Sequence, residues 1–214
     1  MTGGLLVDLY DTAIEADWST LSALLRERFG TDDAGLRHAF QFTRIARGTG
    51  HYGSIAGNLR ALAAACNRPL DDDAGARLAA DLVAAMRASV HLYPDVVPVL
   101  RRLRAAGTRV ALVSNCDHAT RPVIEALGLG AEVDAVVLSC EVASLKPDRR
   151  IFDEALGRLG VTAGASRFVD DQSLYLDGAA ALGLRTFRIV RDPAFPDPAA
   201  SPAHVVITSF DELP

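Results

Sequence analysis

The chain has 214 residues, of which 50% are hydrophobic and 23% are charged, and its formal net charge is −5. This length suffices for one sizeable core, or for one core with a smaller appended unit. The acidic balance argues against nucleic acid as a partner, because binding to a phosphate backbone needs a basic face. No apolar stretch approaches the roughly 20 residues that a membrane helix needs, and no basic region precedes an apolar segment at the start. We therefore expect a cytoplasmic protein without a membrane partner.

The first predicted element is a short buried strand in GGLLVDLY, residues 3–10. From Trp18 onward, apolar residues recur every three or four positions, which predicts helices. Gly30 and the GTGHYG segment at 48–53 interrupt this pattern. It resumes in a stretch that begins with aspartates at Asp71, as is typical of a helix N-terminus. We expect residues 16–91 to form a helical unit without strands.

After LYPD at 92–95, predicted helices alternate with strands that are apolar on both faces. This alternation indicates a parallel sheet covered by helices. The fold class is therefore α/β, with a Rossmann-like core of residues 1–15 and 92–214 and the helical unit inserted after the first strand. The later predicted strands are RVALVSN, VDAVVLS, SRFVDD, RTFRIV and HVVIT.

Chemically useful residues follow several of these strands. Ligands of such sheets bind outside the carboxyl ends of the strands, so residues at these ends are candidates for one shared site. Lys146 stands out further, because 21 of the 22 basic residues are arginine and it is the single lysine. We expect the following residues to converge at one edge: Asp8, Ser114, Asn115, Lys146, Asp170 and Asp171.

This set suits phosphoryl transfer. A carboxylate such as that of Asp8 can attack phosphorus and form an acyl-phosphate, which splits one difficult displacement into two steps. A reaction between two anions needs charge neutralisation, which Mg²⁺ held by Asp8 and Asp171 would supply with Lys146 alongside. The hydroxyls of Ser114 and Thr12 would hold the non-bridging phosphoryl oxygens.

The order VDLYDT, LVSN, LKPD and FVDD resembles the four motifs of the haloacid dehalogenase (HAD) superfamily. The helical insertion after the first motif resembles the C1 cap of that superfamily, so that the resemblance covers essentially the whole chain. It implies Asp8 as the nucleophile, Ser114 and Lys146 as the residues of motifs two and three, and Asp170 with Asp171 as the acidic pair of motif four.

Motif one departs from the phosphatase pattern of this superfamily at Tyr10. The resemblance implies a second Asp here, which protonates the leaving group and then activates water. A phenol with a reference pKa of about 10 serves this double role poorly, although the main-chain carbonyl of Tyr10 could still bind Mg²⁺. Asp11 is one step further along and is no ready replacement, and His118 is another candidate proton donor.

Tyrosine at this position also resembles the 2-haloacid dehalogenases, in which Asp attacks carbon and no metal is needed. Those enzymes lack a consecutive acidic pair in motif four, because uncompensated carboxylates would repel a carboxylate substrate. Asp170 and Asp171 therefore favour a cation site. Motif one and motif four thus indicate different reactions.

Within the helical unit, Arg44 and Arg47 lie three residues apart and would share a helix face. They could reach an anionic substrate from there, or the face could simply be solvated. Asn115 is a further candidate for binding substrate.

We expect a HAD-type hydrolase that acts on a small, phosphorylated metabolite with Mg²⁺, and the sequence gives no indication of its oligomeric state. Asp8, Lys146 and Tyr10 are the catalytic candidates, and Mg²⁺ would be held by Asp8, Asp170, Asp171 and the Tyr10 carbonyl. The alternatives are metal-independent dehalogenation of a small 2-halo acid, with Asp8 attacking carbon, and a HAD-fold protein that binds a ligand but has lost turnover.

Overall fold

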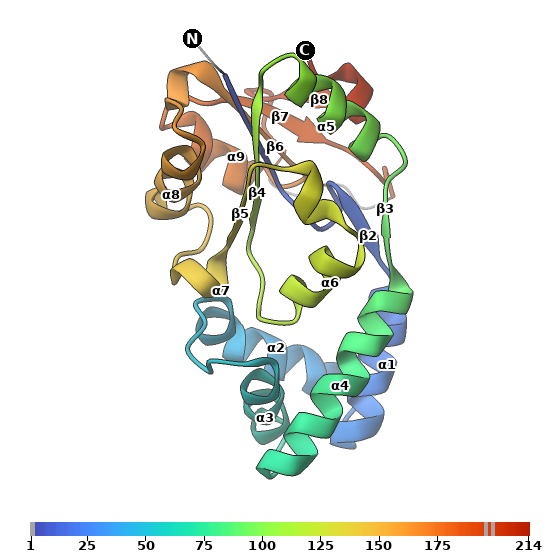
Figure 1. The fold of residues 1–214 in the computed structure, drawn as a ribbon. Coiled ribbons are helices and arrows are strands. Elements are labelled where there is room, and N and C mark those ends of the chain that lie inside the picture. Colours follow the sequence, from blue (N-terminus) through green and yellow to red (C-terminus); the bar gives the residue numbers. More distant parts are fainter. Residues whose placement is uncertain (1–2, 195–196, 198–199) are drawn as a thin grey trace.

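The structure is a computed structural model that describes residues 3–194, 197 and 200–214. Within these residues a six-stranded parallel sheet has the order β5-β4-β1-β6-β7-β8 (Figure 1). The sheet matches the predicted α/β class, and each of its strands falls within a predicted one. Its strands are β1 (Gly4–Val7), β4 (Arg109–Ser114), β5 (Ala135–Leu138), β6 (Ser166–Asp170), β7 (Arg185–Ile189) and β8 (Val205–Ile207).

Helices cover both faces of this sheet because its strands are apolar on both sides. In β1, Leu5 and Val7 join one core cluster, whereas Leu6 joins the other. The first cluster packs beneath α5 (Val96–Ala105) and α6 (Thr120–Ala126), and the second beneath α8 (Arg149–Leu159) and α9 (Ser173–Ala180). The other described elements of this part are α7 (Ser139–Val142) and the 3₁₀ turns Leu129–Glu132, Ala163–Ala165 and Phe210–Glu212.

The helical unit lies at the carboxyl edge of the sheet, at the end of the molecule opposite the chain termini (Figure 1). Aspartate or serine side chains cap the start of each of its helices, which satisfies backbone N–H groups that lack a helical partner. Its own core contains Leu25, Phe29, Leu36, Leu59 and Leu62. Its helices are α1 (Trp18–Phe29), α2 (Asp33–Gly48), α3 (Ile55–Ala65) and α4 (Asp72–Ser89).

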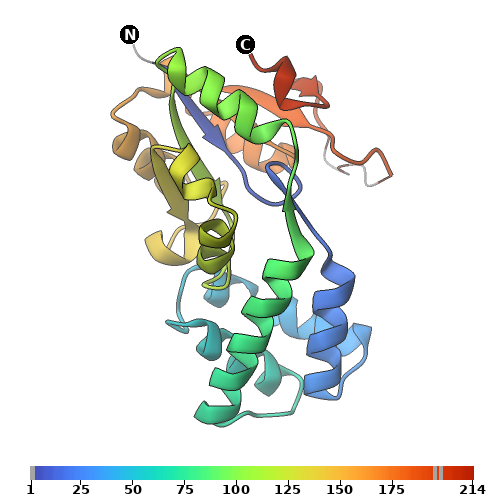
Figure 2. The ribbon, with the colours of Figure 1, turned by 45° about the vertical axis from the view of Figure 1, so that its right-hand side comes forward.

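Two short antiparallel strands, β2 (Ile14–Ala16) and β3 (Val90–Leu92), connect the sheet domain to these helices. Figure 2 shows the two connections running side by side. The prediction that residues 16–91 contain no strand was therefore wrong at both ends, because strands of three residues are too short to show a periodicity. The domain boundaries themselves stay a prediction.

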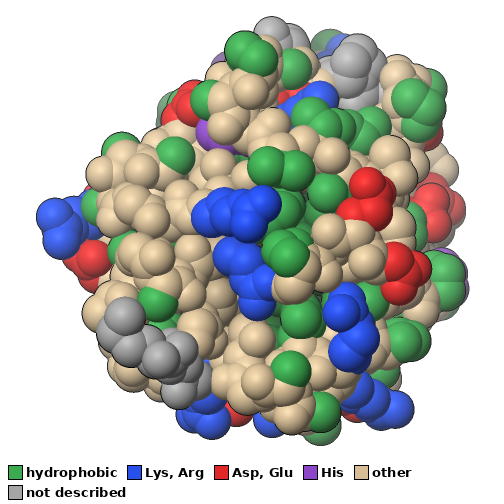
Figure 3. Space-filling model, turned by 90° about the horizontal axis from the view of Figure 1, so that it is seen from above, with side chains coloured by type: hydrophobic (Ala, Val, Ile, Leu, Met, Phe, Trp, Pro, Cys, Tyr) green, Lys and Arg blue, Asp and Glu red, His purple; other side chains and the backbone are tan. Residues whose placement is uncertain are grey.

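At the end of the molecule that carries the termini, basic side chains gather near the middle of the surface (Figure 3). Burial lowers the pKa of Arg167, and repulsion from Arg185 and Arg102 lowers it further.

No helix within the described residues is long and apolar enough to cross a membrane.

Candidate active site

Three carboxylates meet where β1 and β6 end. Val7 of β1 pairs with Val169 of β6, so Asp8 and Asp170 leave the sheet side by side, and the Asp8 amide donates to the Val169 carbonyl at 3.0 Å. One carboxylate oxygen from each of Asp8, Asp170 and Asp171 lies within 4.8 Å of the other two. The structure thus brings together the acidic residues that the sequence predicted for this edge.

Lys146 joins these carboxylates from the loop before α8. Its buried ammonium donates to Asp8 Oδ1 and, at 2.6 Å, to Asp170 Oδ2. Burial alone would lower the pKa of Lys146, but the charges of Asp170 and Asp8 raise it above its ordinary value, so that the ammonium stays charged.

Asn115 holds the main chain of this lysine in place. Its Nδ2 donates to the Lys146 carbonyl at 2.9 Å, and its Oδ1 accepts from the Lys146 amide at 2.7 Å. Because both amide atoms are engaged, Asn115 acts in this structure as a positioning residue. Direct binding of substrate by Asn115 stays a prediction.

The carboxylate of Asp171 has an oxygen atom that is available for a ligand. Its Oδ1 atom is buried and has no hydrogen-bond partner among the described residues. Burial and the charges of Asp8 and Asp11 raise the pKa of Asp171 to about 7. Asp170, by contrast, already accepts from Lys146 Nζ and, at 2.8 Å, from the Gln172 amide.

This donor set fits a divalent cation that prefers oxygen ligands. Three carboxylates face one ammonium within the described part of the site, which leaves the cluster negative when all are ionised. Asp8 and Asp171 are better placed than Asp170 to hold Mg²⁺, since both oxygens of Asp170 are already engaged. Metal binding by Asp170 and by the Tyr10 carbonyl stays a prediction.

Two buried hydroxyls near the strand ends also lack partners. Thr12 Oγ1 and Ser114 Oγ lie in residues exposed by no more than 1%, and neither forms a hydrogen bond within the described residues. A buried hydroxyl without a partner costs about 1–3 kcal/mol. Such atoms suit the predicted role of binding the oxygens of an anionic substrate.

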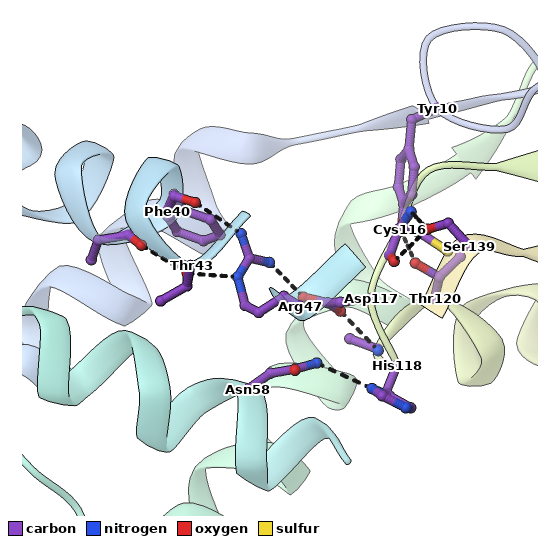
Figure 4. Close-up of polar contacts among 12 residues, drawn as sticks. Tyr10, Phe40, Thr43, Arg47, Asn58, Cys116, Asp117, His118, Thr120 and Ser139 are labelled. Atoms are coloured by element: carbon purple, nitrogen blue, oxygen red, sulfur yellow. Dashed lines mark hydrogen bonds and ion pairs between the residues drawn. The ribbon is translucent and has the colours of Figure 1, made fainter. Parts of the chain in front are cut away.

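Tyr10 does not supply the missing acid. Its hydroxyl lies 3.2 Å from Thr120 Oγ1 (Figure 4). Its ring packs against Trp18 with centroids 5.1 Å apart. Burial raises the pKa of the Tyr10 phenol well above its ordinary value, so it is a weaker proton donor than a free tyrosine. The ring instead forms part of a cavity wall.

A cavity of about 470 Å³ lies between the helical unit and the loop after β4. Tyr10 and Asn115, which lie close in the chain to Asp8 and Ser114, line this cavity, whereas Asp8 and Asp171 do not. Most of its wall is apolar, with a few polar side chains among them. The wall includes Trp18, Leu21, Leu25, Phe40, Arg47, Asn58, Leu59, Leu62, Leu82, Met86, Asp117 and Thr120.

The two arginines predicted to share a face are separated. Arg47 Nη1 forms an ion pair with Asp117 Oδ2 at 2.7 Å across the boundary of the helical unit (Figure 4). Arg44 is exposed and does not line the cavity. Residues three apart on a helix still differ by about 60° in direction, which is enough to place one inward and the other in solvent.

His118 takes part in the same boundary. Its Nδ1 lies 3.4 Å from Asn58 Nδ2 of α3, so the ring is engaged with the helical unit (Figure 4). The sequence singled out His118 as a proton donor, but no signal in it indicated that Asn58 or Asp117 would meet residues so distant along the chain.

The Arg47–Asp117 pair is expected to couple the two parts of the protein energetically. A double-mutant cycle with Arg47→Met and Asp117→Asn should give a coupling of about 1–2 kcal/mol in urea unfolding, because the two side chains are only 11% and 21% exposed. The exposed pair Arg149–Asp153 is the control and should give below about 0.5 kcal/mol. Equal couplings for the two pairs would contradict this prediction.

Comparison with known proteins places the chain in a family. The family model of haloacid dehalogenase-like hydrolases matches residues 5–183. The (S)-2-haloacid dehalogenase 4A of Burkholderia cepacia is 33% identical over 122 residues, which is 56% of this chain and 53% of that protein. Enolase-phosphatase E1 of Gluconacetobacter diazotrophicus is 34% identical over 131 residues, 60% of this chain and 54% of that protein.

These matched regions span about half the length of the curated relatives. Among solved structures, a HAD phosphatase from Thermococcus onnurineus covers 100% of this chain and 96% of its own with a TM-score of 0.71 at 21% identity, which shows a shared fold. Dehalogenases and phosphatases both occur among the relatives. The chain belongs to the haloacid dehalogenase-like hydrolases.

Proposed function

We propose that this hydrolase is a Mg²⁺-dependent phosphatase that acts on a small phosphomonoester through an aspartyl-phosphate on Asp8. The observation that carries the proposal is the excess of carboxylates: Asp8, Asp170 and Asp171 face the single ammonium of Lys146 within the described site. A 2-halo acid would add another carboxylate to this cluster, whereas Mg²⁺ would complete it. The expected location, the cytoplasm, stays a proposal.

In this mechanism Asp8 attacks phosphorus with the oxygen that Lys146 does not hold. The bond from phosphorus to the leaving oxygen breaks, and water then attacks the phosphorus of the acyl-phosphate, which releases inorganic phosphate and regenerates Asp8. Ser114 and Thr12 would donate their free hydroxyls to phosphoryl oxygens. Bound at Asp8 and Asp171, Mg²⁺ would offset the repulsion between Asp8 and the phosphoryl group.

The site restricts the leaving group. Tyr10 offers no acid for the leaving oxygen, because burial raises the pKa of its phenol and Thr120 engages its hydroxyl. Phosphate esters whose alkoxide or phenolate leaves readily without a proton are therefore favoured, such as aryl and enol phosphates. The largely apolar cavity beyond Tyr10 would accommodate the carbon skeleton of such a group.

Two small substrate panels test this proposal. We expect phosphate release from p-nitrophenyl phosphate with Mg²⁺, loss of this activity with EDTA, and much slower release from glycerol phosphate, whose leaving group needs a proton. Halide release from 2-chloropropionate that is insensitive to EDTA, together with no phosphate release, would overturn the proposal.

Dehalogenation is the second candidate, and a specific feature favours it. An apolar cavity reaches Tyr10, which stands where the phosphatase motif has its acid, and a carbon–halogen bond needs no proton donor for its leaving halide. In that reaction Asp8 would attack carbon, and halide would depart. The EDTA comparison above separates the two reactions.

The raised pKa of Asp171 leads to a prediction about stability. The pKa of Asp171 is about 7 in the folded chain and about 3.9 in the unfolded chain, so the folded chain holds this proton more tightly. The resulting contribution to stability is fully present below about pH 4 and is lost as the pH rises through about 7. Without a cation, the melting temperature should therefore fall over this range. Mg²⁺ binds the ionised form, so the increase in melting temperature with Mg²⁺ should be larger at about pH 8 than at about pH 5.5.

Thermal melts in EDTA and in Mg²⁺ at both pH values check this prediction. The variant Asp171→Asn should lose the pH-dependent gain from Mg²⁺, whereas Asp153→Asn on the exposed face of α8 should retain it. A Mg²⁺ effect that is absent at both pH values in the wild-type chain would count against a metal at this site.

A further inference from the structure

Two of the three cysteines lie next to each other beside the active site. Ser114 at the end of β4 pairs with Leu138 at the end of β5, so Cys116 and Cys140 each follow this pair by two residues. Neighbouring parallel strands lie about 4.8 Å apart, and a disulfide needs a Cα separation of about 4.4–6.8 Å. The strand register thus starts the two segments side by side, two residues before each cysteine.

Ser139 holds the two segments together just beyond the sheet. Its Oγ accepts from the Cys116 amide at 3.0 Å and donates to the Cys116 carbonyl at 3.0 Å, as Figure 4 shows. Ser139 is the residue immediately before Cys140 in the chain. The pKa of the Cys116 thiol is raised and that of the Cys140 thiol is lowered, in each case mainly through the other thiol, which indicates that the two thiols are close neighbours.

The pair is open to small reagents on one side and touches functional residues on the other. Cys116 lines the cavity, whereas Cys140 is only 6% exposed. Thr120, whose hydroxyl is the partner of Tyr10, lines the same cavity as Cys116. At Gly50, in the turn after α2, an added Cβ would clash with the Cys140 carbonyl, so the helical unit packs directly on this segment.

We propose that Cys116 and Cys140 form a reversible disulfide that fastens the loop after β4 to α7 beneath the helical unit. With hydrogen peroxide as oxidant, one thiol attacks the O–O bond to give a sulfenic acid and water. The second thiol then attacks this sulfur, which forms the S–S bond and releases a second water. Two thiols and one peroxide yield one disulfide and two waters.

Formation of this disulfide does not depend on the proposed phosphatase activity. The third cysteine, Cys66, packs with the separate core of the helical unit and provides a matched control. The protein carries a single tryptophan, Trp18, which lies against Tyr10 in the cavity wall, so its fluorescence reports on this region.

The test oxidises the reduced full chain with hydrogen peroxide and maps its peptides without reduction. Wild type and Cys66→Ser should lose two hydrogens in mass, yield a Cys116–Cys140 peptide pair, and return to the starting mass with dithiothreitol. Neither Cys140→Ser nor Cys116→Ser should give this pair. The peptide map of the wild-type chain tests the proposal without any variant. The test therefore remains valid even if a variant folds poorly.

Two further readouts test whether the bond fastens the loop. The oxidised chain should melt roughly 5–10 °C higher than the reduced chain, because a native cross-link constrains the unfolded state. Trp18 emission should shift on oxidation and recover on reduction. No Cys116–Cys140 pair in the wild-type chain, a bridge that uses only Cys66 or a second chain, or an unchanged melting temperature would overturn the proposal.

Discussion

Replacing Asp8 with Asn is expected to lower phosphate release by roughly 10⁴–10⁶-fold, because the amide cannot attack phosphorus and no covalent intermediate forms. The change removes one of the two carboxylates that hold Lys146, but Asp170 still holds its ammonium at 2.6 Å. The variant should therefore remain folded. The measurement is phosphate release from p-nitrophenyl phosphate with Mg²⁺, together with a thermal melt.

The control is Asp153→Asn, an exposed carboxylate on α8 that should leave the rate unchanged. Beryllofluoride should form an adduct on Asp8 in the wild-type chain and not in Asp8→Asn. If Asp8→Asn keeps more than a few per cent of the rate, the carboxylate is not the nucleophile. If the wild-type chain binds Mg²⁺ but shows neither turnover nor adduct, the third hypothesis, a binding protein without turnover, is supported instead.

Replacing Tyr10 with Asp is expected to raise phosphate release from glycerol phosphate by roughly 10²–10⁴-fold, the usual contribution of a positioned general acid. The wild-type phenol is a poor proton donor because burial raises its pKa and Thr120 engages its hydroxyl. The gain should be far smaller for p-nitrophenyl phosphate, whose leaving group needs no proton. The measurement is kcat/KM for both substrates.

The matched control is Tyr10→Asn, which has nearly the same shape as Tyr10→Asp and removes the same contacts with Thr120 and Trp18 but provides no acid. A gain that is equal in both variants would trace to the enlarged cavity and not to proton transfer. A gain that is equal for both substrates would also contradict the assignment.

Strand ends made much of this site predictable from sequence. Asp8, Ser114 and Asp170 each stand where an apolar strand finishes, and parallel strands bring such residues to one edge whatever their separation in the chain. Lys146 was predictable for another reason, since it is the single lysine in an arginine-rich chain. The fold class followed from the alternation of strands and helices.

The parts that sequence did not predict depend on long-range packing. Periodicity gives the face of a helix only coarsely, so it could not separate Arg47, which meets Asp117, from the exposed Arg44. The sequence also gave no sign that the amide of Asn115 would bind the main chain of Lys146, 31 positions away. The strands β2 and β3 carry three residues each, too few for an alternating pattern.

Strands β2 and β3 also limit how the helical unit can move relative to the sheet. Both crossings of the chain between the sheet domain and the four helices pass through this one hydrogen-bonded ribbon, so the two tethers must bend together. Sliding of one part over the other would break that pairing, whereas a swing about the ribbon preserves it. A swing about the ribbon would separate the two parts on the side where Arg47 meets Asp117 and Asn58 meets His118, and it would break those two contacts.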